Sequence, residues 1–201
     1  MKSFSFLIII VISLSGYSQI TSTGATIPDA QIINICGDIN TDEAPLNSYF
    51  KDIDHTFDKF IGTWHYVNGN EILIFELSKV TERYDPEYAI YEDYMIGNYS
   101  YSNDGGSTFI INSITLPIDE DANNNPMYAV CADTDSINFT FVDVLIEKGT
   151  YCTANFEFLP GSDTQMEVEI KIPIGARGRL AGETPFDLNF SIPTEMIVTK
   201  Q

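Results

Sequence analysis

Residues 165–172, QMEVEIKI, alternate strictly between polar and apolar side chains. Because successive side chains of a strand point to opposite faces, this run predicts a strand with one dry face and one wet face. Its apolar positions are Met166, Val168, Ile170 and Ile172. A second run, 151–158, alternates in the same way, with apolar positions Cys152, Ala154, Phe156 and Phe158. Such strands are typical of antiparallel sheets that have solvent on one side.

Similar short runs follow one another along most of the chain, and polar or glycine-rich turns separate them. Asn68-Gly69 stands between two of these runs, and Asn-Gly is a strong hairpin signal. The pattern predicts about eight to ten short strands in a barrel or a sandwich. Hairpins in series favour a closed up-and-down β-barrel, because closure removes the exposed edges of a sheet. The expected fold class is therefore an all-β, antiparallel barrel.

Two elements are expected before the barrel. A short strand is predicted at residues 31–35. A short helix is predicted to follow and to end at Gly62, because apolar residues recur at helical spacing. These residues are Phe50, Ile53, Phe57 and Phe60.

The chain begins with the layout of a secretory signal peptide. One lysine precedes a short apolar run, and Gly16 and Ser18 stand before the expected cleavage site. The apolar run is too short to span a membrane, which takes about 20 apolar residues. We expect a signal peptide at 1–18, an extended arm at 19–46 and the barrel domain at 47–201. The protein would then be exported to the periplasm or the extracellular space.

Charge and cysteine content narrow the partners and the compartment. The formal net charge of −19 repels nucleic acid and anionic lipid. In an oxidising compartment the three cysteines predict one disulfide and one remaining thiol. Cys131 and Cys152 are the preferred pair, because both lie in strand-like runs separated by room for one strand and two turns. Cys36, in the arm, is left as an alternative partner for either of them.

A short helix that runs into Gly62-Thr63-Trp64, followed by a meander of strands, resembles the lipocalin and calycin class of barrels. That resemblance implies that Trp64 packs across the closed end of the barrel. It also implies that a basic residue near the last strand lies over the tryptophan ring. Candidates for this residue are Lys200, Arg179 and Arg177.

Three segments resemble an uncharacterised family of secreted Bacteroidota proteins that is carried as a domain of unknown function. They are YFKDIDHTFDKFIGTWHYVNGNE, IYEDYMIGNYSY and IPTEMIVTKQ. The resemblance covers about residues 46–112 and 185–201, whereas 113–184 matches poorly. It implies a compartment and domain boundaries, and no catalytic activity.

The functional expectation is a secreted, non-enzymatic, lipocalin-like barrel that holds a small apolar ligand or none. The residues expected to line its interior are Trp64, Tyr66, Phe139, Phe141, Phe156, Phe158, Val168 and Ile170. The alternative is an interaction or structural module of the envelope or cell surface, suggested by the tyrosine-rich run 84–101 and the acidic composition. A carboxylate-based hydrolase is a third alternative, with Glu76, Glu92 or Asp93 turned inward.

Other chemistry finds little support in the residue pattern. There is no G-x-S-x-G elbow, and the two histidines, His55 and His65, do not lie in a zinc-binding pattern. The acidic loop 119–125 fails the helix–loop–helix calcium pattern, so a solvated turn is expected. A weak calcium site that adds Asp133 or Asp135 stays open as the alternative. No cofactor or metal is expected, and no catalytic residue is assigned.

Overall fold

The computed structural model describes residues 31–37, 44–116, 124–146, 151–173 and 187–201. These residues form strands and turns without an α-helix. The strands are β1 (Ile32–Asn34), β2 (Tyr49–Lys51), β3 (Gly62–Asn68), β4 (Glu71–Asp85), β5 (Ile90–Ser102), β6 (Ile111–Asn112), β7 (Met127–Ala129), β8 (Ser136–Phe141), β9 (Cys152–Phe158), β10 (Gln165–Lys171) and β11 (Glu195–Lys200). The short strand predicted at residues 31–35 is confirmed as β1.

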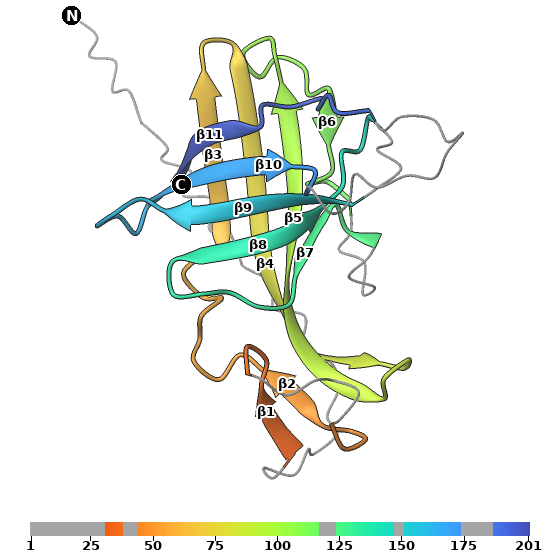
Figure 1. Cartoon of the computed structure of the whole chain (residues 1–201). Coiled ribbons are helices and arrows are strands. Elements are labelled where there is room, and N and C mark those ends of the chain that lie inside the picture. The colour runs from red at the N-terminus through yellow and green to blue at the C-terminus, as the bar shows by residue number, and fades with distance from the viewer. Residues whose placement is uncertain (1–30, 38–43, 117–123, 147–150, 174–186) are drawn as a thin grey trace, which may run out of the picture.

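Eight of the strands close into an antiparallel barrel, as the sequence pattern predicts (Figure 1). Their order is β5-β4-β3-β11-β10-β9-β8-β7, and β7 pairs back onto β5. Apart from the short β6, which adds to β5, each barrel strand pairs with its neighbour in the chain. The last strand, β11, closes the circle against β3, with Lys200 opposite Trp64. The barrel is therefore an up-and-down barrel.

The strand faces follow the alternation in the sequence. In β10 the apolar Met166, Val168 and Ile170 are buried, whereas Glu167 lies in solvent. β5 differs, because both of its faces are buried from Asp93 to Ser102. Its inner face adds to the barrel core, and its outer face packs under other parts of the chain. Val80, Tyr94 and Ile96 form a small second cluster there.

A small extension lies beneath the barrel, where β4 and β5 continue past it as a long hairpin (Figure 1). β2 pairs with β5 in parallel, and β1 pairs with β2 in parallel, so the extension is a short mixed sheet. Four non-glycine residues in and around it have positive φ angles: Asn47, His55, Glu82 and Ala89. Such backbone costs free energy and persists only where the surroundings fix it.

The predicted helix before Gly62 is wrong, and Asp52 supplies the physical reason. After β2, the backbone N–H groups of Thr56 and Phe57 donate to the Asp52 carboxylate at 2.8 and 3.2 Å. These two N–H groups therefore donate to a side chain and not to the backbone carbonyls that would accept them in a helix. His55, with a φ of 56°, also interrupts any helix. The apolar spacing instead puts Phe57 and Phe60 into the core through turns, while Ile53 stays 46% exposed.

Candidate functional site

The barrel interior contains every residue that the sequence assigned to it. Seven of the eight are buried core residues, and Tyr66 is partly buried and packs against them. The rings contact one another across the barrel. Phe156 lies 5.1 Å from Phe75 and 5.4 Å from Phe139, and Phe141 stacks on Tyr99 at 5.4 Å, between ring centroids.

Among the described residues, these contacts leave no space for a ligand around the central rings. Trp64, Phe75, Phe139 and Phe156 have exposed fractions of 0%, so no water-sized void borders their side chains. Gly97 shows the same tightness, because a Cβ atom there would lie 2.9 Å from Leu77 Cδ2 and 3.1 Å from Met127 Cβ. The side chains expected to line a ligand cavity fill the interior instead.

The end of the barrel where β3 begins is closed by aromatic rings. Trp64 Nε1 donates to the carbonyl of Phe60 at 2.8 Å, and the Trp64 ring packs edge-on against Phe158. Lys200 Nζ lies 5.1 Å from the centroid of the Trp64 ring and donates to the carbonyl of Lys59 at 3.0 Å. The predicted cation over the tryptophan is therefore confirmed for Lys200. Arg177 and Arg179, the other candidates, lie outside the described residues.

The opposite end is closed by hydrogen bonds between loops. Tyr99 Oη donates to the carbonyl of Val142 at 3.0 Å and accepts from the Val144 N–H at 3.1 Å. Burial raises the pKa of the Tyr99 phenol, so it stays protonated for this role. The buried Asp143 accepts from the Ser191 N–H at 2.8 Å and from its hydroxyl at 2.5 Å. These hydrogen bonds connect β5, the loop after β8 and the segment before β11 at this end of the barrel, which is called the barrel mouth below.

A buried charge cluster joins the barrel to its extension, and it holds one of the acids that the sequence singled out. Asp93, which is 1% exposed, accepts from Tyr49 Oη at 2.5 Å and from the N–H groups of Asp52 and Glu82 at 3.0 and 3.1 Å. Asp52, which is 2% exposed, accepts from Thr56, Phe57 and Lys79, whose Nζ lies 2.8 Å away.

The shifted pKa values in this cluster agree with a structural role, in which it holds the extension to the barrel. Burial raises the pKa of Asp52, but the hydrogen bonds from Lys79, Thr56 and Phe57 outweigh it and hold that pKa below the usual value. Burial lowers the pKa of Lys79, and its contact with Asp52 more than compensates, so that pKa is raised. Burial and the bond to Asp93 raise the pKa of the Tyr49 phenol. The donors that hold both carboxylates belong to the protein itself.

The other two acids considered for an inward role do not enter the barrel. Glu76 is exposed on the outer face of β4. Glu92 lies in the extension and is paired with Arg83 at 3.1 Å. Burial and the nearby Asp85 charge raise the pKa of Glu92 despite that pair. The structure therefore does not bring the three predicted acids together.

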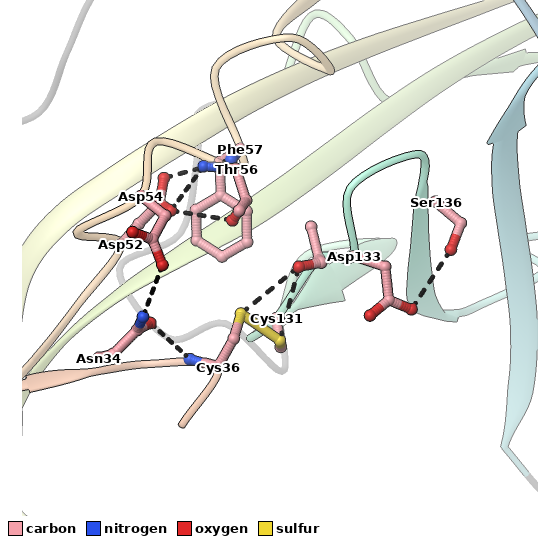
Figure 2. Close-up of a disulfide and its surroundings, with 10 residues drawn as sticks. Asn34, Cys36, Asp52, Asp54, Thr56, Phe57, Cys131, Asp133 and Ser136 are labelled. Carbon is pink, nitrogen blue, oxygen red and sulfur yellow. Dashed lines mark hydrogen bonds between the residues drawn. A yellow bond between two sulfur atoms is a disulfide. The ribbon is translucent and has the colours of Figure 1, made fainter. Parts of the chain in front are cut away.

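The disulfide differs from the preferred pairing. Cys36 bonds to Cys131 (Figure 2). Cys152 stays a thiol buried in the barrel wall at 1% exposure. The preference for Cys131 with Cys152 is wrong because Cys152 points into the core with the apolar face of β9. The bond ties the strand of the arm to the loop after β7, across a sequence separation of 95. Linear spacing carries no signal for such a contact.

The two histidines lie outside the barrel interior. His55 is exposed and lies 3.2 Å from Asp58, and His65 is on the outer wall, where burial lowers its pKa. In the described part of the chain, no group of three or more His, Cys, Asp or Glu side chains is placed to hold a metal ion. Most of the acidic loop 119–125 lies outside the described residues. No described helix is long and apolar enough to cross a membrane.

Three hollows in the surface are lined by described residues. One of about 450 Å³ lies at the barrel mouth and is lined mainly by Ile170, Ile172, Leu188, Phe190, Ile192 and Pro193. A second, of about 290 Å³, lies on the outer wall of β9–β11 among Asn155, Glu157, Glu167, Glu169 and Glu195. A third, of about 240 Å³, lies on the outer wall of β4 and β5 among Glu76, Ser78, Ile96, Asn98, Ile114 and Leu116.

The fold and these sites define a closed, antiparallel, eight-stranded β-barrel with a filled interior and hollows on its outer surface. The chain belongs to a family of unknown function, DUF6705, whose model matches residues 1–201. The expected membership of an uncharacterised family is therefore confirmed, and the match includes residues 113–184. No curated protein and no solved structure matches the chain.

Proposed function

We propose that this chain is an exported, non-enzymatic barrel that acts as a binding module through its outer surface. The observation that carries the proposal is the filled interior, where Trp64, Phe75, Phe139 and Phe156 are 0% exposed. A barrel that holds a ligand needs a cavity, and ligand cavities usually measure about 300–1,000 Å³. Of the expected functions, the surface interaction module therefore has more support than a ligand carrier of the lipocalin type.

Two further features support the proposal. The Cys36–Cys131 disulfide suits an oxidising compartment outside the cytoplasm, as does the signal-like segment 1–18. The two buried carboxylates, Asp52 and Asp93, are occupied by donors of the chain itself. A general acid or base must instead reach a substrate.

A cavity experiment tests the surface role directly. Xenon or benzene should find no interior site in the wild-type barrel, whereas Phe156→Ala should create one and bind the probe. The variant should also lose about 3–5 kcal/mol of unfolding free energy. Probe binding can be read in xenon-pressurised crystals or from NMR shifts of interior amides. Interior uptake of either probe by the wild-type protein would contradict the proposal.

Export is tested separately in the native host. Cell fractionation followed by mass spectrometry should find the protein outside the cytoplasm, with Gln19 as its first residue. A chain that stays in the cytoplasm with residues 1–18 attached would remove the export part of the proposal.

A second candidate function, carriage of a small apolar ligand, has one observation in its favour. The hollow at the barrel mouth measures about 450 Å³, six of its nine described lining residues are apolar, and one of these, Leu188, is 59% exposed. A fluorescent apolar probe such as anilinonaphthalene sulfonate should then bind, and Leu188→Asp should abolish binding. Ile197→Asp, at a residue 52% exposed on the outer wall, is the matched control and should leave binding unchanged. Equal binding by both variants would exclude the mouth as the ligand site.

A further inference from the structure

Asn98, on the outer face of β5, is a buried amide whose side chain has no hydrogen-bond partner among the described residues. The residue is only 7% exposed, and its side chain makes no hydrogen bond within the described part of the protein. Neighbouring buried polar groups do have partners: Ser100 donates to Asn112, Ser102 to Asp104, and Ser113 to the Tyr99 carbonyl. Buried amides are normally satisfied, and leaving one unmatched costs free energy. Among the described residues, none supplies the hydrogen-bond partner that the Asn98 amide lacks.

Asn98 borders one of the hollows on the outer wall of the barrel. β7 pairs with β5 at Met95 to Gly97, and β6 pairs with it at Ser100 and Tyr101. Asn98 falls between these two ladders, on the outer face of β5. The chain after β6 passes nearby and supplies Ile114 and Leu116 as a second wall. The result is the hollow of about 240 Å³ described above.

The lining of this hollow has a clear chemical character. Glu76 lies directly opposite Asn98 on the neighbouring strand, and Ser78 lies opposite Ile96. Like Asn98, Glu76 and Ser78 make no side-chain hydrogen bond to a described residue. Glu76 only accepts hydrogen bonds, whereas Asn98 and Ser78 can both accept and donate. No described residue of the lining is a lysine or arginine, and the whole chain carries a net charge of −19. An anionic ligand is therefore disfavoured, and a molecule with hydrogen-bond donors is favoured.

We propose that the hollow between β4, β5 and residues 114–116 binds a small neutral or cationic molecule that donates hydrogen bonds. Asn98, Ser78 and Glu76 accept those hydrogen bonds, and Ile96, Ile114 and Leu116 pack against a short apolar part of the ligand. The shared chemistry fits a small amine or a hydroxyl-rich sugar unit. This inference rests on the proposed function, because it gives the outer surface a specific ligand site.

An NMR titration of the full-length protein tests the site. The side-chain amide of Asn98 is observed in ¹⁵N-labelled protein while isobutylamine, methyl glucoside or isobutyrate is added. Isobutylamine, methyl glucoside or both should shift the Asn98 side-chain resonances to saturation, and the anionic isobutyrate should not. Saturation by the amine alone identifies a cationic ligand, and saturation by the glucoside alone identifies a polyol. Failure of both to saturate, or equal binding of isobutyrate, would overturn the inference.

Variants separate the site from non-specific binding. Asn98→Leu and Ser78→Ala should each reduce the affinity at least tenfold, read from backbone resonances of Glu76 and Ile114. Asn138→Leu, at an exposed position of β8, is the matched control and should keep the wild-type affinity. Asn98→Leu should also melt a few degrees higher than the wild type, because it removes an unmatched buried amide. Retention of binding by Asn98→Leu would overturn the inference.

The two proposals fail in different ways. If no probe saturates the Asn98 amide while xenon stays out of the interior, only this ligand site is lost. If xenon enters the wild-type interior, the surface role is lost whatever Asn98 binds.

Discussion

Lys200 and Trp64 show at the scale of single residues how one contact can close a barrel end. The Lys200 ammonium lies over the Trp64 ring at 5.1 Å and donates to the Lys59 carbonyl. It thereby connects the last barrel strand to the first and to the turn before it. Burial lowers the pKa of Lys200, so the ring and the carbonyl must compensate for lost solvent.

We expect Lys200→Met to destabilise the protein by about 1–2 kcal/mol, since it removes a cation–π contact and a hydrogen bond. Urea unfolding followed by the fluorescence of Trp64, the only tryptophan, measures the change. Lys171→Met is the matched control, because the side chain is 49% exposed and its ion pair in the described structure is with Glu169. If both variants lost the same unfolding free energy, the position of Lys200 over Trp64 would contribute nothing specific to stability.

This contact could be anticipated from the sequence, whereas Asn98 could not. The resemblance to lipocalin-class barrels implies a basic residue over the ring of Trp64, and few basic residues lie near the last strand. Asn98 lies in a run, YMIGNYSY, that gives no sign of two buried faces. Its burial depends on where β6, β7 and residues 114–116 lie across β5, which is a long-range packing effect.

At the scale of elements, the turn after β2 and the β4–β5 hairpin are joined by the Asp52–Lys79 pair. The strands were predicted correctly because the alternation of polar and apolar residues is a local signal. The helix prediction failed because the Asp52 carboxylate accepts hydrogen bonds from the N–H groups of Thr56 and Phe57. Asp52 is held in place for this by Lys79 and Asp93, which belong to strands distant in the sequence. The cysteine pairing failed for a similar reason, since Cys36 and Cys131 meet only after the extension has folded against the barrel.

The pH dependence of stability should reveal the Asp52 cluster. The pKa of Asp52 is lowered in the folded state, so its contribution is present above the unfolded pKa of about 3.9 and is lost as the pH falls below it. Lys79 has a raised pKa, so its contribution is lost only as the pH rises through values above about 10.4. In urea unfolding between these limits, Asp52→Asn should be less stable than the wild type by about 3–5 kcal/mol.

The difference between the two proteins should shrink as the pH falls below the unfolded pKa of Asp52. Comparing variant with wild type cancels other acids such as Glu92, whose raised pKa acts in the opposite direction. A difference that stays constant down to the acid limit would contradict a charged Asp52 in the folded state.

The disulfide can be tested by thiol reactivity as well as by stability. Cys36→Ser should destabilise the protein by about 2–5 kcal/mol, since the bond closes a long loop. In wild-type protein, a thiol reagent should find no reactive cysteine in the native state and one after unfolding, because Cys152 is buried. A rapidly reacting native thiol would indicate that Cys36, which is exposed, is outside the bond.

At the scale of the whole molecule, negative charge dominates the surface. The net charge is −19, and like charges even face each other across the wall of β9–β11. Glu157 lies opposite Glu167, and Glu169 lies opposite Glu195. Directly opposed like charges destabilise a sheet. The composition predicted an acidic surface, but only the strand register shows which acids oppose one another.

Added salt should therefore stabilise the protein. Raising NaCl from about 10 mM to about 500 mM shortens the screening length several-fold and should raise the free energy of unfolding. Glu167→Lys should add about 0.2–1 kcal/mol at low salt, because it places opposite charges across the β9–β10 pair. The gain should fade at high salt. A gain that is independent of salt would point to packing instead of charge.

β11 completes the barrel by pairing with β3 on one side and β10 on the other. Until residues 195–200 have been synthesised, both of those strands carry an open edge, and strand edges invite pairing with other chains. The long-range closure also makes folding slow compared with the pairing of hairpins. A nascent chain of this kind therefore benefits from a chaperone that shields strand edges until β11 emerges. Substitutions that weaken β11 should show first as aggregation during synthesis.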